Sequence, residues 1–310
     1  MGNTNDTQIT LFRILGFPSL HKLKNLIFVL GLFIYIITLF GNVFIVLMVR
    51  KENRLHLPMY FFLVNISVID IFYTSNIVPQ MLATFVVEIF IISYTGCISQ
   101  FFIHICLGSG ECLTLATMAV DRYVAVCNPL HYLTIMNYTV CAALLAGVWL
   151  VAVIANIPPL MSVCWLNFCG SNTVNHFFCD APPLLEISCY GSQVVESVNF
   201  VVAACIIMSS FSVIMLSYIM IIRAIILIPT KGGKLKTFST CASHLIIVSI
   251  FFGSLMIMYV RPGYTNSPEY NKIVAVCYTM VTPMLNPIIY TFRNRDIKHA
   301  VKTYFMCHSA

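Results

Sequence analysis

The sequence predicts an all-α membrane protein: a bundle of seven membrane-spanning helices with the N-terminus outside and a short amphipathic helix at the C-terminus. Of the 310 residues, 59% are hydrophobic and only 9% are charged, whereas a soluble domain carries about a quarter charged residues. The apolar residues gather into seven blocks, each about as long as a helix that crosses a bilayer. Short segments connect the blocks, so we expect one domain over residues 1–310.

The first two blocks have clear limits. Residues 26–49 contain no charged residue and lie between Lys24 and Arg50. No cleavable signal peptide precedes this block, so we expect it to act as an uncleaved signal anchor. The second block, residues 58–85, begins at a proline and contains a single acid.

The remaining blocks follow the same pattern. Residues 97–119 contain one acid, and residues 140–160 and 238–260 contain no Asp, Glu, Lys or Arg. Residues 195–222 and 271–292 carry one charge each, near the start of the block. The strands of a transmembrane β-barrel would instead alternate apolar and polar residues over about ten positions. These long apolar blocks therefore predict helices.

The basic residues indicate how the bundle is oriented. Most Lys and Arg residues fall in the segments that lie inside the cell when the N-terminus is outside, and the acids gather in the other segments. Cytoplasmic loops carry an excess of basic residues. We therefore expect residues 1–25 to be an extracellular tail and residues 293–310 a cytoplasmic tail. The net charge of +6 is a topology signal, and no soluble domain is present to bind nucleic acid.

Cysteines and a glycosylation sequon support this sidedness. The chain has 13 cysteines, and Cys97, Cys169, Cys179 and Cys189 lie on the predicted outer side, where an oxidising compartment permits two disulfides among them. The segment Asn5-Asp6-Thr7 is a glycosylation sequon on the same side.

Several motifs in order resemble those of one membrane protein family. The string MAVDRYVAVCNPLHY, from Met118 to Tyr132, resembles the cytoplasmic end of the third helix in rhodopsin-like G-protein-coupled receptors, and its second half is similar to the olfactory receptor family. At this rim of the bilayer we expect Asp121 to neutralise Arg122. Further matches are Gly41-Asn42, the string LHLPMY from Leu55, Ser217-Tyr218, the string KTFSTCASH from Lys236 and the string PMLNPIIY from Pro283. The resemblance covers nearly the whole chain.

This resemblance implies a function and several residue roles. It implies an odorant receptor of the plasma membrane, in sensory neuron cilia, that activates a stimulatory heterotrimeric G-protein and raises cyclic AMP. It also implies disulfides between Cys97 and Cys179 and between Cys169 and Cys189. The residues that the resemblance assigns to G-protein coupling and activation are Asp121, Arg122, Tyr123, Tyr218, Lys236, His244, Asn286, Pro287 and Tyr290.

Helix-facing arguments together with the resemblance predict a ligand cavity in the outer half of the bundle. The expected lining residues are His104, Ile105, Gly108 and Ser109 in the third helix, Val202, Cys205 and Ile206 in the fifth, Phe251, Leu255 and Tyr259 in the sixth, and Tyr278 and Thr279 in the seventh. Such a lining is mostly apolar with few hydrogen-bonding groups, which suits small, weakly polar odorants. Because residue 104 is His and not Asp, we expect no cationic amine.

Two acids, Asp70 and Glu111, lie at mid-membrane depth with no basic residue at that level. Two uncompensated carboxylates repel each other, so either one is protonated or both share a cation. Similar receptors use the position of Asp70 for sodium, and Asn42 and Asn286 would supply polar neighbours. Both alternatives, a sodium site and a hydrogen-bonded polar cluster, remain open at this point.

The C-terminal tail shows helical periodicity. Apolar residues recur at Ile297, Ala300, Val301, Tyr304 and Phe305, and basic residues occupy the other face at Arg295, Lys298 and Lys302. This pattern is typical of a helix that lies on the anionic inner leaflet. Cys307 beyond it is a candidate for acylation.

Other classes of function receive less support. His176 and Cys179 could be read as a metal site, but a disulfide at Cys179 consumes the thiolate that a soft metal needs. An intramembrane protease would need a base beside Ser109, and His104 points about 140° away on an ideal helix. A transporter or channel, the alternative to a receptor, would show inverted repeats or broken helices. We therefore expect no enzyme, no cofactor and no metal beyond a possible sodium ion.

Overall fold

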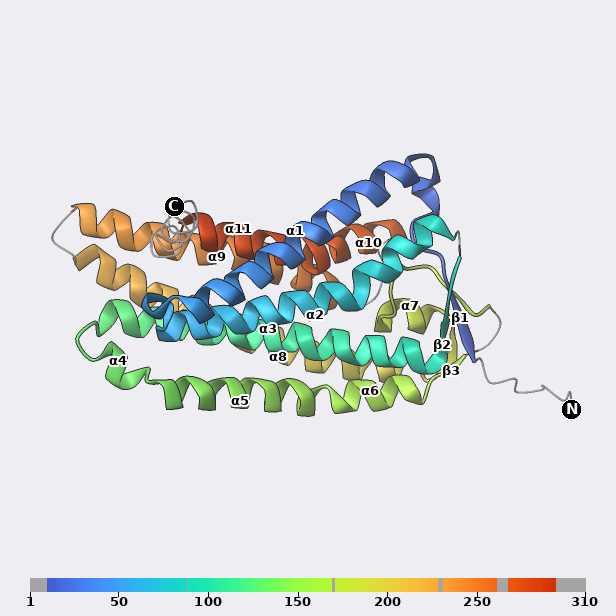
Figure 1. The fold of residues 1–310 in the computed structure, drawn as a ribbon. Helices are drawn as coiled ribbons and strands as arrows, with labels where there is room; N and C mark the ends of the chain where they lie inside the picture. Colours follow the sequence, from blue (N-terminus) through green and yellow to red (C-terminus); the bar gives the residue numbers. More distant parts are fainter. Residues whose placement is uncertain (1–9, 88, 169–170, 228–230, 261–266, 294–310) are drawn as a thin grey trace, which may run out of the picture.

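A computed structural model of the chain describes residues 10–87, 89–168, 171–227, 231–260 and 267–293. Within these ranges, the side chains of residues 21, 190, 231–243 and 290–293 are not described. Figure 1 shows an elongated bundle of long helices lying side by side. The strands lie at one end of this bundle (Figure 1), and that end is called the outer end from here on.

The main helices confirm the predicted seven-helix bundle, with bounds that extend beyond the apolar blocks. They are α1 (Lys24–Lys51), α2 (Pro58–Val86), α3 (Tyr94–Cys127), α5 (Tyr138–Ala155) with α6 (Ile157–Cys164), α8 (Ser192–Leu227), α9 (Lys231–Tyr259), and α10 (Pro268–Val276) with α11 (Thr282–Arg293). Six of these spans are long and apolar enough to cross a membrane, and the described apolar part of α9, His244–Tyr259, is shorter.

Two of the spans are not regular α-helices from end to end. The fourth span is interrupted between α5 and α6, where Asn156 is not helical and two prolines follow it. In the seventh span, the π-helical turn η3 (Cys277–Val281) separates α10 from α11. Proline cannot donate the backbone hydrogen bond of a regular helix, which explains the first break.

Side chains at the helix ends satisfy free backbone groups. Ser93 accepts a hydrogen bond from the backbone N–H of Gly96 at 3.1 Å and starts α3. Asn137 accepts one from the backbone N–H of Val140 at 3.0 Å and starts α5. Ser and Asn are favoured at this position because their oxygen replaces a missing helical acceptor.

Short elements complete the connections between the spans. They are the 3₁₀-helices η1 (Pro18–Leu23) and η2 (Asn53–Leu55), the helices α4 (Tyr132–Ile135) and α7 (Ala181–Glu186), and the strands β1 (Leu11–Ile14), β2 (Phe90–Ser93), β3 (Asn167–Phe168), β4 (Thr173–Val174) and β5 (Ser188–Tyr190). Strand β3 pairs with β5 in an antiparallel ladder.

Part of the predicted extracellular tail is ordered structure. Strand β1 pairs with β2 in an antiparallel ladder and with β4 in a parallel one, which gives the sheet order β2-β1-β4. Phe12 and Ile14 of β1 are fully buried, and their neighbours Leu11 and Arg13 are exposed. This alternation is the period of a half-buried strand. The N-terminal segment therefore forms part of a cover over the outer end.

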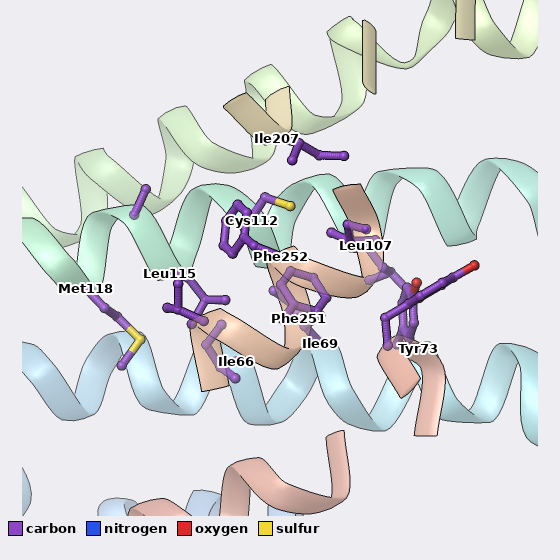
Figure 2. Packing of buried hydrophobic residues seen from close by; sticks show 14 of the residues in the cluster. Ile66, Ile69, Tyr73, Leu107, Cys112, Leu115, Met118, Ile207, Phe251 and Phe252 are labelled. Atoms are coloured by element: carbon purple, nitrogen blue, oxygen red, sulfur yellow. The ribbon is translucent and has the colours of Figure 1, made fainter. Parts of the chain in front are cut away.

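The interior of the bundle is packed with apolar side chains from four helices. Figure 2 shows Ile66, Ile69 and Tyr73 of α2, Leu107, Cys112, Leu115 and Met118 of α3, Ile207 of α8, and Phe251 and Phe252 of α9 pointing toward one another. Large apolar side chains also cover the outside of the bundle, such as Phe40, which is 74% exposed. An apolar outside is what a lipid-facing surface requires.

Candidate functional site

A cavity of about 180 Å³ lies in the outer half of the bundle, between α3, α6, α8, α9 and the segment that follows Cys179. Eight of the twelve predicted residues line it: His104, Ile105, Gly108, Ser109, Val202, Ile206, Leu255 and Tyr259. The four from α3 share one face, as their spacing predicts. Whether they contact a ligand stays a prediction.

The other four predicted residues lie elsewhere. Phe251 is fully buried in the core, and Tyr278 and Thr279 are fully buried in η3 without lining the cavity. Cys205, which the sequence predicted in the wall, is exposed on the outside of α8. Its neighbour Ala203 lines the cavity, and two residues correspond to about 200° around a helix, so Cys205 faces away.

The cavity also has lining residues that the sequence did not reveal. They are Tyr73, Phe101, Cys112, Asn156, Pro159, Asp180, Ala181, Glu196, Ser197, Asn199, Phe200, Ala203 and Ile207. The most important is Asp180, and the implied disulfide between Cys97 and Cys179 could have revealed it, because that bond places its neighbour against the third helix. The expectation of no cationic amine rested on the absence of an acid at residue 104. That reason no longer holds, since Asp180 and Glu196 both line the cavity.

The polar groups of the cavity converge on the hydroxyl of Tyr259. This hydroxyl donates to Oδ2 of Asp180 at 2.6 Å, and it lies 3.2 Å from Nε2 of His104 and 3.0 Å from the hydroxyl of Tyr278. Asp180 and Tyr278 are fully buried, and His104 is 3% exposed. These four residues are called the polar pole. The pole joins α3, α9, η3 and the outer loop at one end of the cavity.

A second polar contact fixes another part of the wall. Asn156, at the break between α5 and α6, donates to Oγ of Ser109 at 2.8 Å and to the backbone oxygen of Ala152 at 2.7 Å. Ser109 therefore contacts an amide donor, and an amide cannot act as the general base that a serine nucleophile needs. This contact positions α6 against α3.

Several of the predicted coupling residues lie at the inner end of the bundle. The hydroxyl of Tyr132 donates to Oδ1 of Asp121 at 2.8 Å, and burial together with the charge of Asp121 raises the pKa of Tyr132, which keeps this donor protonated. Asp121 and Arg122, both in the described part of the chain, form no direct ion pair. Adjacent helical residues point about 100° apart, so the two side chains do not bond directly, and the expected neutralisation of Arg122 by Asp121 stays a prediction.

Arg122 and Tyr123 are partly exposed at the same end. The hydroxyl of Tyr218 on α8 lies 2.8 Å from Nδ1 of the buried His244 on α9, so this pair joins the two helices near their inner ends. Lys236 lies in α9 and Tyr290 in α11, but their side chains are outside the described part of the structure.

Comparison with known proteins decides the family. The family model described as "Olfactory receptor" matches residues 31–308, which is most of the chain. The chain belongs to the olfactory receptor family.

Curated relatives within the olfactory receptor family match almost end to end. The mouse (Mus musculus) protein "Olfactory receptor 5M5" is 44% identical over 96% of this chain and 93% of its own. The human (Homo sapiens) protein "Olfactory receptor 11L1" is 42% identical over 96% of this chain and 92% of its own. Among solved structures, squid rhodopsin is similar in fold, with a TM-score of 0.70 and 19% identity over 91% of this chain and 81% of that one.

Family membership settles the coarse function. The chain is an odorant receptor and a multi-pass protein of the plasma membrane, and it is not an enzyme. As a G-protein-coupled receptor, it has a small-molecule ligand and a G-protein as partners.

The expected disulfide of this olfactory receptor family member is confirmed. Cys97 and Cys179 are bonded, and their Cα atoms lie 5.4 Å apart. Cys189 is also disulfide-bonded, but its expected partner Cys169 lies outside the described residues, so this pairing stays a prediction.

Three further expectations fall outside the described residues. They are the glycosylation site Asn5, the amphipathic helix of the C-terminal tail and the acylation candidate Cys307. All three stay predictions.

The two mid-membrane acids are both fully buried. Asn286 donates to both carboxylate oxygens of Asp70, at 3.2 and 2.9 Å, whereas the amide of Asn42 donates to the backbone oxygens of Thr38 and Pro283 instead. Both carboxylate oxygens of Glu111 and the amide oxygens of Asn42 and Asn286 have no hydrogen-bond partner among the described residues.

These carboxylate and amide oxygens suit a hard cation such as sodium, because hard cations take such oxygens as ligands. Protonation of one carboxyl would supply a single donor for several unpaired acceptors. The sodium site and the protonated, hydrogen-bonded cluster therefore both stay predictions.

Proposed function

We propose that this receptor binds small, mostly apolar odorants in the cavity of about 180 Å³ and activates a stimulatory, olfactory-type heterotrimeric G-protein that raises cyclic AMP. The observation that carries the proposal is the cavity itself, a mostly apolar space with a few convergent polar groups in a chain of this family. Small-molecule sites have this composition.

The helices that form the cavity wall also carry the coupling residues, which gives a physical route between the two ends. Helix α8 contributes Ile206 to the cavity and Tyr218 to the inner end, and α9 contributes Leu255 to the cavity and His244 to the inner end. A ligand that contacts both helices changes their packing at the outer half. The bond between Tyr218 and His244 is the inner contact that such a change would strain.

Activation then requires that the ligand binds one arrangement of these helices more tightly than the other. In the active arrangement, the inner end of α9 moves away from α3 and α8 and exposes Arg122 to the G-protein. Arg122 is already partly exposed, and its neighbour Asp121 is held by Tyr132. Arg122 is therefore the cation that we assign to the partner contact.

A screen of a chemically broad odorant panel, with cyclic AMP as the readout in cells that express this chain, tests the function. With an active odorant in hand, Arg122→Ala at matched surface expression is expected to abolish the cyclic AMP response, because it removes the cation at the partner surface. The control is Arg54→Ala, since the Arg54 side chain is 75% exposed in η2 and has no role in this account. An unchanged response of Arg122→Ala would remove Arg122 from the coupling role.

A further inference from the structure

Described segments cover the wall of the cavity at the outer end of the bundle. Asp180 and Ala181 of the outer loop, and Phe101 and His104 of α3, line the cavity there, and all four are buried. Phe12 of strand β1 is fully buried in the same apolar cluster as Phe101 and Ala181. The N-terminal strand and the outer loop therefore close this end.

The side of the cavity toward α6 is closed as well. Asn156 and Pro159, which line that side, are both buried. The amide of Asn199 on α8 donates to Oγ of Ser162 on α6 at 3.4 Å, which joins the two helices. Of the lining residues that the structure describes, Ser197 on α8 alone is exposed. The cavity therefore reaches the surface of the bundle beside Ser197.

Ser197 lies on the face of α8 that is turned toward α9. Farther along this face, the ring of Phe211 lies 5.8 Å from that of Phe252 on α9, and Tyr218 contacts α9 through the hydrogen bond described above. Ala204 and Ser197 lie seven and fourteen residues before Phe211. Seven residues are close to two helical turns, so all of these side chains share one face.

The side chains on this face change in size along α8. In the inner half, the large rings of Phe211 and Tyr218 fill the contact with α9, whereas the outer half has only the small side chains of Ala204 and Ser197. The two helices do not close on each other there, because Ser197 is exposed and Ala204 and Tyr259 are only half-buried. The seam between α8 and α9 is therefore tightly packed in the inner half and open in the outer half.

The surface around this opening is apolar, as a lipid-facing surface is. Val194 and Val201, three residues before and four residues after Ser197, are exposed, and so is Ile257 on α9. The hydroxyl of Ser197 donates to the backbone oxygen of Gln193 at 2.8 Å, so it needs no water. Helix α8 begins only five residues before Ser197, which is about 7.5 Å along the helix. The opening therefore faces the outer leaflet.

We propose that odorants enter and leave the cavity from the outer leaflet of the membrane, between α8 and α9 at Ser197. The proposal rests on the proposed function in taking the cavity as the odorant site. Small, mostly apolar molecules partition from water into lipid, by about four-fold more for each methylene group, so the bilayer raises their concentration at the opening. The outer end can then stay covered while ligands exchange.

Two variants that block the opening test the route. Ser197→Trp fills it at the surface. Ala204→Leu fills the seam seven residues farther in, and it keeps the test open if the first variant does not fold. Association and dissociation of a radiolabelled active odorant are measured on the purified full-length receptor in lipid nanodiscs, without a G-protein.

Ser197→Trp is expected to slow both association and dissociation by about ten-fold and to leave the dissociation constant within about two-fold, because a barrier in a passage affects both directions equally. Ala204→Leu should slow both rates in the same way. The matched control is Met208→Trp, since Met208 is exposed on the same helix eleven residues beyond Ser197. This control should keep both rates.

A homologous series of the same odorant distinguishes the membrane from water as the source. Entry from lipid predicts an association rate constant, referred to the aqueous concentration, that rises by about four-fold for each added methylene group. Entry from water predicts the same rate constant for every member of the series.

Unchanged rates in either blocking variant overturn the proposal, and so does a constant association rate along the series. A change in the dissociation rate alone also overturns it, because Ser197 would then be a ligand contact and not part of a passage. Ala203→Phe separates the two proposals. If binding survives this substitution, the cavity is not the odorant site and both proposals fall. If binding is lost while the blocking variants keep their rates, only the entry route falls.

Discussion

His176 in the outer loop is a buried, titratable side chain. It is 2% exposed, and its ring centroid lies 4.7 Å from that of Phe177 and 4.7 Å from that of Phe178. Burial, followed by the positive charge of Lys272, lowers the pKa of His176 to about 3. The folded outer loop therefore requires a neutral His176.

This lowered pKa predicts acid sensitivity of the folded receptor. In the unfolded chain a histidine has a pKa of about 6.5, so between about pH 6.5 and pH 3 the unfolded state binds a proton that the folded state does not. The free energy of unfolding should then fall with decreasing pH in this window, by up to about 1.4 kcal/mol per pH unit from this group.

The variant His176→Phe should flatten that dependence, measured as the thermal midpoint of the purified receptor from about pH 7 to about pH 4. The control is His131→Phe, since His131 lies exposed in the inner loop. A slope in His176→Phe equal to that of the original chain would show that His176 is not the group responsible.

At the scale of the helix, α1 and α11 approach each other closely at Gly41. A Cβ atom added at Gly41 would lie 2.9 Å from both Cβ and Cγ of Pro287. A proline ring cannot rotate away, so the two helices would have to separate. The Gly-Asn and Asn-Pro motifs of the first and seventh helices are therefore in contact here.

Gly41→Ala is expected to destabilise the receptor by about 1–3 kcal/mol, because overpacking forces backbone shifts. The matched control is Gly147→Ala in α5, where no atom lies within 4 Å of the added Cβ and alanine favours the helix. Thermal unfolding of the two purified variants checks this. Equal midpoints would mean that the contact at Gly41 relaxes freely.

The sequence predicted where the helices lie better than which side chains of each helix face the cavity. Long apolar blocks determine where spans lie, because the bilayer fixes their length. Helix α8 is apolar on most of its faces, so periodicity could not show that Ala203 faces the cavity and Cys205 the outside. Strand β1 was missed because its partners β2 and β4 lie far away in the chain, and local pattern does not reveal distant pairing.

For the molecule as a whole, the outer loop forms part of the cavity wall and is bonded to two of the long helices. The disulfide between Cys97 and Cys179 holds the loop against α3. The next residue, Asp180, accepts a hydrogen bond from the hydroxyl of Tyr259 on α9. A ligand at the polar pole therefore meets groups from α3, α9 and the loop at once, and the same helices reach the inner end. We therefore expect ligand occupancy and helix arrangement to be coupled through this shared framework.

The cyclic AMP dose-response of an active odorant in two variants of α8 tests whether the cavity is the odorant site. Ala203→Phe places a large side chain in the cavity wall, and Cys205→Phe places the same side chain on the outside of the same helix. At matched surface expression, Ala203→Phe is expected to lose the response and Cys205→Phe to retain it. Full potency in Ala203→Phe would contradict the assignment of the cavity as the odorant site.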